Sequence, residues 1–422
     1  MTSEGAPGTA FVWVWLPGAG EPVVAGRLDA VGVSLQFTYG QSYLARENAI
    51  SLYVPELPLG DDSIMPLVGT APGCIEDAAP DSWGQRVILN RRLGRDAVDT
   101  ADLTLLDYLL ESGSDRIGAL DFQDSPRTYI PRVGASATLT ELAESADMVD
   151  RRVPLTPPLA DALLRGSSIG GARPKVGIED GERRLIAKFA SQTDPYPVVQ
   201  AEFVGMRLAA LAGLDVAPVE LTTAMDKHAL LVERFDRPGS GERRAMVSAL
   251  TILGLAEHEA RYASYADLAR IVRERFAKPD RTLHELFARI TFNILISNND
   301  DHARNHSAFW DGEALRLTPA YDLCPQRRDT GSTEQVMIIG EDGWKASRLQ
   351  GCIERAATYH LTAERAREIV DRQIGVIEKH WAEVCTQAEL SELDARRMWG
   401  TQLLNPSVFE SYSGRTPSAL AP

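Results

Sequence analysis

The stretch that decides the fold is Asn298-Asn299-Asp300-Asp301-His302-Ala303-Arg304-Asn305, a loop built almost entirely of polar residues. It follows a predicted helix over 282–297 and precedes a predicted hairpin over 307–317, which turns at Asp311-Gly312. Within the loop, Asp300 and Asn305 are separated by four residues. A carboxylate and an amide at this spacing indicate a functional loop, although ordinary turns also favour Asp and Asn.

A third polar residue, Asp322, follows the predicted hairpin. Phosphoryl transfer requires one carboxylate that orients the attacking hydroxyl, and an amide and a second carboxylate that hold Mg²⁺. Protein kinases space the base and the amide as D-x-x-x-x-N and place the metal-binding aspartate later in the chain. Asp300, Asn305 and Asp322 have this order, but no His-Arg pair precedes Asp300 and no Phe-Gly pair follows Asp322. The pattern predicts a phosphotransferase.

A lysine upstream strengthens this interpretation. Lys188 lies near the end of a predicted strand over 185–189, after a loop of small residues over 167–173. Kinases carry the lysine that contacts the nucleotide phosphates at such a place. Glu202, on the next predicted helix, is a candidate partner, with Glu220 and Glu233 as alternatives.

Composition limits the class of protein. The 422 residues include 44 Lys and Arg against 59 Asp and Glu, for a net charge of −15, which argues against a chain whose main task is binding nucleic acid. The four cysteines form no C-x-x-C pair, which favours a reducing compartment. No apolar run approaches the roughly 20 residues of a membrane span, so we expect a cytoplasmic protein that does not enter membranes.

Several motifs in this order resemble the HipA family, the serine/threonine kinase toxins of bacterial toxin–antitoxin modules. The matching pieces are Ser168-Ile169-Gly170-Gly171-Ala172-Arg173-Pro174-Lys175, Leu231-Val232-Glu233-Arg234-Phe235-Asp236, Asp300-Asp301-His302-Ala303-Arg304-Asn305, Leu317-Thr318-Pro319-Ala320-Tyr321-Asp322, and Pro80-Asp81-Ser82 with Gly113–Ala119 in the N-terminal part. The resemblance covers most of the chain. It implies an α+β, protein-kinase-like two-lobed fold with an N-terminal α+β accessory subdomain.

The expected domains follow from this resemblance and from Pro- and Gly-rich interruptions in the sequence. They are an accessory subdomain over 1–125, a linker and lead-in over 126–165, an N-lobe with the phosphate loop and hinge over 166–240, a helical C-lobe with the catalytic and metal-binding loops over 241–410, and a flexible tail over 411–422.

The resemblance also implies roles for individual residues. Asp300 would be the catalytic base, and Asn305 and Asp322 the Mg²⁺ ligands. ATP would be held by Lys188 at the phosphates and by Glu233 and Phe235 at the hinge. The further nucleotide-binding positions are Ser168, Gly170, Gly171, Ala172, Arg173 and His302. Ser168 would be the serine of autophosphorylation, with its neighbour Ser167 as the alternative. Arg173-Pro174 departs from the family pattern and leaves the movement of this loop open.

Family members phosphorylate aminoacyl-tRNA synthetases and are held by a small helix-turn-helix antitoxin whose dimer binds the operator. The resemblance therefore implies a HipB-like antitoxin partner and a synthetase substrate, with DNA contacted mainly through the antitoxin. Two alternatives stay open. The D-x-H-x-x-N pattern at 300–305 is also similar to lipid kinases and small-molecule phosphotransferases, and a kinase-like module without turnover could serve only to bind the antitoxin.

Overall fold

The computed structural model describes residues 8–93, 103–166, 169, 171, 173–191, 194–239, 241–327 and 333–417. The chain divides into two compact units. Unit 1 comprises Met1–Thr193, Thr222–Val247 and Phe309–Glu313, and unit 2 comprises Asp194–Leu221, Ser248–Ala308 and Ala314–Pro422. No helix in the described ranges is long and apolar enough to cross a membrane.

Unit 1 begins with a five-stranded antiparallel sheet in the order β4-β3-β2-β1-β5. Its strands are β1 (Thr9–Val14), β2 (Val23–Val31), β3 (Ser34–Tyr39), β4 (Ser63–Ile64) and β5 (Leu120–Gln123). In β3, Leu35, Phe37 and Tyr39 are buried while the alternate residues are partly exposed. This alternation of period two is the pattern of a strand with one buried face, and it is already visible in the alternating polar and apolar residues of Ser34–Tyr39.

A buried ion pair stabilises β5 within unit 1. Arg116 Nε lies 2.8 Å from Asp121 Oδ1 with both side chains fully buried, and Arg132 contacts the same oxygen at 3.0 Å. Burial alone would raise the pKa of Asp121, but the charges of Arg116 and Arg132 lower the pKa to about 2. The carboxylate therefore stays ionised inside the subdomain.

A second sheet has the strand order β6-β7-β9-β8. Its strands are β6 (Lys175–Asp180), β7 (Arg183–Phe189), β8 (Val219–Ala224) and β9 (Lys227–Glu233). Gly181 makes the β6–β7 turn with φ 59°, a left-handed conformation that glycine adopts at little cost. The Asp180-Gly181 pair in the sequence favours such a tight hairpin turn.

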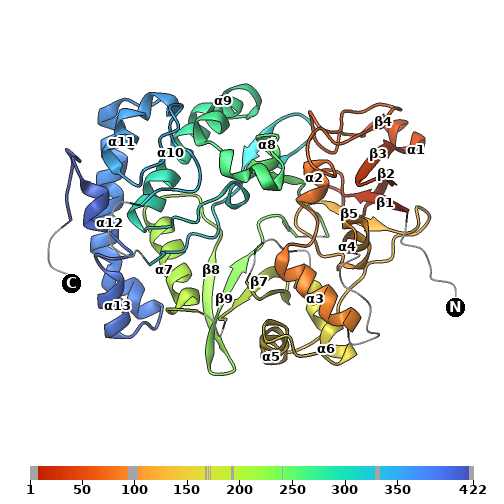
Figure 1. Ribbon diagram of the computed structural model, residues 1–422, viewed down its shortest axis with the longest axis horizontal. Helices are drawn as coiled ribbons and strands as arrows, with labels where there is room; N and C mark the ends of the chain where they lie inside the picture. The colour runs from red at the N-terminus through yellow and green to blue at the C-terminus, as the bar shows by residue number, and fades with distance from the viewer. Residues whose placement is uncertain are drawn as a thin grey trace. The chain divides into compact units, whose positions relative to one another are not determined.

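Helices of unit 1 pack against this second sheet. These are α3 (Ser82–Leu93), α5 (Leu139–Asp150) and α6 (Pro157–Ala162). The other helices of unit 1 are α1 (Gln41–Leu44), α2 (Gly73–Glu76) and α4 (Leu105–Glu111), of which α1 and α4 contact strands of the first sheet. Figure 1 shows α3, α5 and α6 beside β7 and β9, and one core cluster joins Trp83 of α3 and Leu142 of α5 to Ala187 of β7. The segment 126–165, predicted as linker and lead-in, thus contains two helices that contribute to this core.

Unit 2 is mainly helical. Its helices are α7 (Val198–Leu211), α8 (Ala249–Ile252), α9 (Tyr265–Arg275), α10 (Pro279–Leu295), α11 (Leu349–Glu354), α12 (Ala363–Gln387) and α13 (Glu392–Met398). A third sheet, whose residues are divided between the two units, has the strand order β10-β11-β12, with β10 at Met246–Ser248, β11 at Ser307–Trp310 and β12 at Leu315–Leu317. Figure 1 shows the long α12 beside α7 and α10, where Gln373 Nε2 donates to Ala288 O at 2.8 Å.

The spacing of Thr282 and Glu285 in the sequence predicts a capping box at the start of α10, and this prediction is wrong. Helix α10 begins at Pro279, after the N-cap residue Lys278, so Thr282 already lies in the first turns. Its hydroxyl donates to Lys278 O at 2.9 Å, and Glu285 pairs with Arg289 one turn later. Proline favours the first helical position because its missing N–H would be unpaired there in any case, and this signal outweighs the capping pattern.

Candidate active site

The polar loop leaves α10 through a sharp turn at Ser297, which has a φ of 55°. Asn298 N donates to Asn293 O at 2.8 Å, which closes the end of the helix. The chain then forms a 3-10 turn over Ala303–Asn305 and continues into β11. Because the turn is tight, Asn305 Nδ2 reaches back to Asp300 O at 3.3 Å. The structure therefore brings together Asp300 and Asn305, which the spacing in the sequence suggests as partners.

Asp300 is exposed, and its surroundings favour its protonated form. The largest influence is the partial shielding of its carboxyl group from water, which raises the pKa of Asp300. His302 lowers this pKa, and the charges of Asp322 and Asp301 raise it. Asp322 is thus close enough to act electrostatically on Asp300, as the kinase pattern requires. A carboxylate with a raised pKa accepts a proton from a hydroxyl more readily than an ordinary aspartate does.

Asp322 adopts a left-handed backbone conformation with a φ of 62°. Such conformations cost a non-glycine residue about 1 kcal/mol or more and concentrate at functional sites. Two contacts hold the segment in place. Asn298 Nδ2 donates to Asp322 O at 3.4 Å, and the Tyr321 hydroxyl donates to Arg304 O at 2.7 Å. These bonds connect the end of the hairpin to the polar loop.

Asn305 and Asp322 offer oxygen ligands of the kind Mg²⁺ prefers. Asn305 is buried, and its Nδ2 is directed to Asp300 O, which leaves Oδ1 as the amide ligand. Within the described ranges no group of three or more His, Cys, Asp or Glu is arranged to hold a metal. Mg²⁺ needs no such cage, because it takes one or two carboxylates and completes its shell with waters and substrate phosphates. The donor set fits this ion.

Lys188, Glu233 and Phe235 belong to unit 1. Lys188 lies on β7 between β6 and β9, opposite Lys175 and Leu230, and so on a central strand of the sheet. Glu233 ends β9 and lies 3.6 Å from Arg183. Phe235 follows the strand and contacts Phe309 edge-on, with 5.8 Å between ring centroids.

Arginine–aspartate pairs hold the chain on both sides of Phe235. Arg234 contacts Asp236 and Asp115 at 2.8 Å each, and Gly118 N donates to Asp236 at 2.8 Å. Burial alone would raise the pKa of Asp236, but the charges of Arg234 and a second arginine lower it strongly. The segment predicted as the adenine hinge is therefore anchored to the loop before β5 by buried charges.

Four predicted residues of the glycine-rich loop, Ser167, Ser168, Gly170 and Ala172, lie outside the described residues. Gly171 and Arg173 lie within them, both in unit 1. Gly171 has a φ of 116°, and a Cβ there would come within 2.5 Å of Lys175 Nζ. The positive φ favours glycine at this position, and a larger residue would also have to displace the Lys175 ammonium group.

Comparisons with known proteins identify the family of the chain. Models of the HipA-like C-terminal domain and the HipA N-terminal domain match residues 167–381 and 14–123. The chain belongs to the HipA family. Y4mE of Sinorhizobium fredii, named as a candidate kinase, is 30% identical over 317 residues, which cover 67% of this chain and 74% of the relative. The serine/threonine-protein kinase toxin HipA of Shewanella oneidensis is 28% identical over 183 residues, 37% of this chain and 42% of the toxin.

A solved structure extends the likeness to nearly the whole HipA fold. A chain of the Shewanella oneidensis MR-1 complex of HipA, HipB and operator DNA aligns with a TM-score of 0.67 at 21% identity. The alignment covers 92% of this chain and 94% of that chain. The predicted kinase-like α+β fold is confirmed.

The sequence did not reveal a buried network beneath the catalytic loop of this HipA-family protein. Asp301 accepts hydrogen bonds from Tyr265 O–H and Asn293 Nδ2, the latter at 2.7 Å, and lies 2.9 Å from His306 Nε2. Burial alone would raise the pKa of Asp301, but His306 and Tyr265 lower it. Asp301 thus anchors the loop inside unit 2 while the adjacent Asp300 faces solvent.

A second feature missed by sequence reasoning lies below the glycine-rich loop. Lys175 is 1% exposed, and its Nζ lies 3.1 Å from Asp81 Oδ2. The other oxygen of Asp81 accepts from Gly84 N at 2.8 Å at the start of α3. The Pro80-Asp81-Ser82 motif therefore links α3 to the base of the loop. The motif was visible in the sequence, but its partner, 94 residues away, was not.

Proposed function

We propose that this protein is an ATP- and Mg²⁺-dependent serine/threonine kinase that acts as the toxin of a toxin–antitoxin module. The observation that carries the proposal is the single turn that joins Asp300 to Asn305, with the charge of Asp322 acting on Asp300. Membership of the HipA family supports the same reaction, because the related Shewanella protein is named a serine/threonine-protein kinase toxin.

In the proposed reaction, Asp300 orients the serine or threonine hydroxyl and accepts its proton as the oxygen attacks the γ-phosphorus. The new P–O bond forms as the bond to the β-phosphate oxygen breaks, and ADP leaves. Bound Mg²⁺ would neutralise charge on the phosphate oxygens. Asn305 and Asp322 would hold the ion, and Lys188 would contact the phosphates.

The remaining nucleotide contacts are assigned by family membership. Glu233 and Phe235 would bind adenine through their backbone groups, because side-chain pairing on both sides of Phe235 holds this segment in one conformation. His302, next to the base, and the glycine-rich loop would approach the phosphates. Ser168 or Ser167 would be the site of autophosphorylation.

We further propose a HipB-like antitoxin as partner and an aminoacyl-tRNA synthetase as substrate. The related Shewanella structure contains HipB and operator DNA. At a net charge of −15 this chain is poorly suited to supply the phosphate contacts, so a basic antitoxin would provide them.

Induction in a bacterial host, followed by phosphoproteomics, tests this function. The wild type should stop growth and add phosphate to a serine or threonine of a host protein. Asp300→Asn should do neither, because loss of a general base lowers the rate about 10²–10⁴-fold. Asp280→Asn, on the exposed start of α10, is the matched control and should behave as the wild type. Equal arrest by the Asp300 variant would refute the proposal, and phosphate found only on metabolites would favour the small-molecule alternative.

A further inference from the structure

A cavity of about 540 Å³ lies within unit 2, and none of the residues assigned to catalysis above lines it. Three segments line it, namely residues 195–197 before α7, Arg327, and residues 394–402 of α13 and the turn after it. Its volume falls in the range of roughly 300–1,000 Å³ that is usual for small-molecule sites.

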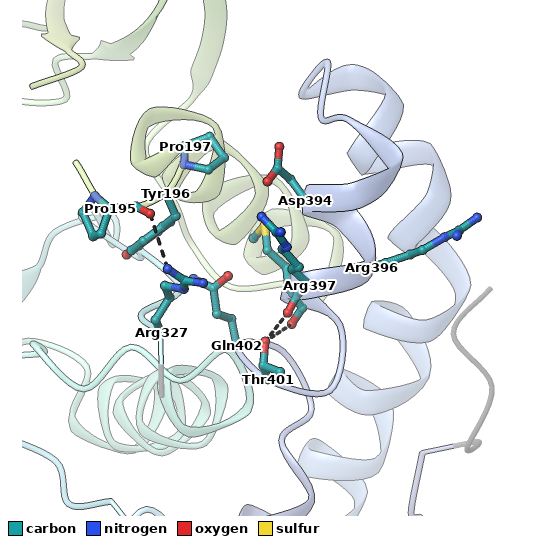
Figure 2. A pocket seen from close by; sticks show the side chains of 10 residues that line it. Pro195, Tyr196, Pro197, Arg327, Asp394, Arg396, Arg397, Thr401 and Gln402 are labelled. Carbon is teal, nitrogen blue, oxygen red and sulfur yellow. Dashed lines mark hydrogen bonds between the residues drawn. The ribbon is translucent and has the colours of Figure 1, made fainter. Parts of the chain in front are cut away.

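Two guanidinium groups face this cavity. Figure 2 shows Arg327 and Arg397 directed into it from opposite sides, while Arg396 points away. Within the described ranges, Arg397 has no hydrogen-bond or ion-pair partner on its guanidinium, and Arg327 donates only to Pro195 O at 3.4 Å. Arg396, by contrast, pairs with Glu392 at 3.3 Å. In a chain with a net charge of −15, two converging arginines without carboxylate partners are unusual.

The carboxylate at the edge of the cavity is already engaged. Asp394 Oδ2 accepts from Ser391 Oγ at 2.6 Å at the start of α13. This hydrogen bond leaves the negative charge of Asp394 in place, but two arginines against one carboxylate still give the cavity a net positive charge.

The walls of the cavity are fixed by hydrogen bonds. Gln402 is buried and donates through Nε2 to Pro325 O at 3.0 Å. The Tyr196 hydroxyl donates to the same oxygen at 3.0 Å and contacts Gln326 Oε1 at 3.2 Å. The backbone that carries Arg327 is thus held between α7 and the turn after α13. Arginines on fixed backbone bind phosphate oxygens strongly, because each planar guanidinium donates two parallel hydrogen bonds.

We propose that this cavity binds the phosphate group of a small phosphate ester between Arg327 and Arg397, with the ring of Tyr196 against the body of the ligand. The inference goes beyond the proposed kinase function and does not depend on it. Because Arg327 follows Asp322 by five residues, an occupant would act on the segment that carries the proposed Mg²⁺ ligand.

Binding of inorganic phosphate to the full chain tests the proposal. The unfolding midpoint is measured against phosphate concentration at constant ionic strength, with chloride as the exchanged ion, for the wild type and for Arg327→Ala, Arg397→Ala and Arg396→Ala. A ligand that binds only the folded protein raises the midpoint, and the rise grows with the logarithm of the ratio of ligand concentration to Kd once that ratio exceeds one. Loss of one charge-assisted pair of hydrogen bonds should weaken phosphate binding about tenfold or more in the first two variants. The Arg396 variant removes the same charge from the same helix and should stay within about twofold of the wild type.

All three arginines are exposed, so the variants should unfold at the wild-type midpoint in chloride. An equal loss in all three variants would indicate a general charge effect and would overturn the proposal. The proposal would also be overturned if the Arg397 variant bound phosphate as tightly as the wild type. The same holds if phosphate did not raise the unfolding midpoint of the wild type.

A second series separates the two sources of a phosphate ester. Glycerol phosphate represents a free metabolite, and a short phosphoserine peptide represents a modified protein. If one of these two ligands bound more tightly than inorganic phosphate, and this binding were lost in Arg327→Ala and Arg397→Ala, the result would support the site. It would also identify the source of the phosphate ester. Binding of both that is independent of these arginines would overturn it. Because the readout is binding, failure here leaves phosphoryl transfer by Asp300 untouched.

Discussion

Replacement of Asp301 by alanine should uncouple the catalytic loop from the core of unit 2. The side chain is 2% exposed and receives hydrogen bonds from Tyr265 and Asn293, with His306 at 2.9 Å. Alanine would leave Asn293 Nδ2 buried without this acceptor, while Tyr265 O–H and His306 Nε2, which lie 2.8 Å apart, would keep only each other. The loop would then lose the anchor that holds the backbone from Asp300 to Asn305.

The magnitude follows from burial. A buried donor left without its acceptor costs about 1–3 kcal/mol, because no water replaces the lost partner. For a domain of about 150–250 residues, each kcal/mol lowers the unfolding midpoint by about 2–4 °C, so a loss of about 2 kcal/mol should lower it by roughly 4–8 °C.

The chain offers a matched control for this measurement. Asp280 also pairs with a histidine, His360, at 2.7 Å, but the two side chains are 76% and 44% exposed. Asp280→Ala should cost at most about 1 kcal/mol, because water solvates both groups after the change. Thermal unfolding of both variants, with kcat for phosphoryl transfer measured below the transition, tests the reasoning. Equal midpoints for the two variants would refute it, as would an unchanged kcat in Asp301→Ala.

Two further predictions concern other parts of the chain. The lowered pKa of Asp121 stabilises the fold above about pH 4, and this contribution, about 2 kcal/mol, is lost as the pH falls towards 2. The free energy of unfolding should therefore fall less steeply with acid in Asp121→Asn than in the wild type, and parallel slopes would contradict the assignment. In α7, a Cβ on Gly205 would lie 2.0 Å from Leu323 O, so Gly205→Ala must displace the backbone next to Asp322. We expect a loss of about 1–3 kcal/mol in urea unfolding, together with a higher Mg²⁺ requirement. Gly375→Ala in α12 meets only the tip of Arg415 at 3.0 Å and should be neutral or stabilising, and a larger loss there than at Gly205 would count against this argument.

Local spacing made much of the fold predictable. The hairpin of β6 and β7 and the strands β11 and β12 follow from short alternating runs around Asp-Gly turns, which are determined by neighbouring residues. Asp300 and Asn305 are five positions apart, so one turn of chain accounts for their meeting. Family resemblance then supplied the two-lobed arrangement that spacing alone leaves open.

Long-range contacts were not predictable. Asp301 meets Tyr265, 36 residues earlier, and Arg234 meets Asp115, 119 residues earlier. A single sequence carries no signal for such pairs, because it does not show which aspartates are buried and which are exposed. The adjacent pair Asp300-Asp301 illustrates this point: one faces solvent and the other is buried, and only the partners packed around them decide which.

Transfer of the γ-phosphate of ATP is the most direct test of the central claim. Purified wild type, Asp300→Asn and the exposed control Asp280→Asn are incubated with γ-labelled ATP and Mg²⁺, and label on the protein is quantified and mapped. The wild type and the control should carry label on Ser167 or Ser168. The amount of label on the Asp300 variant should be lower by a factor of about 100 or more. Equal labelling of the Asp300 variant and the wild type would contradict the account.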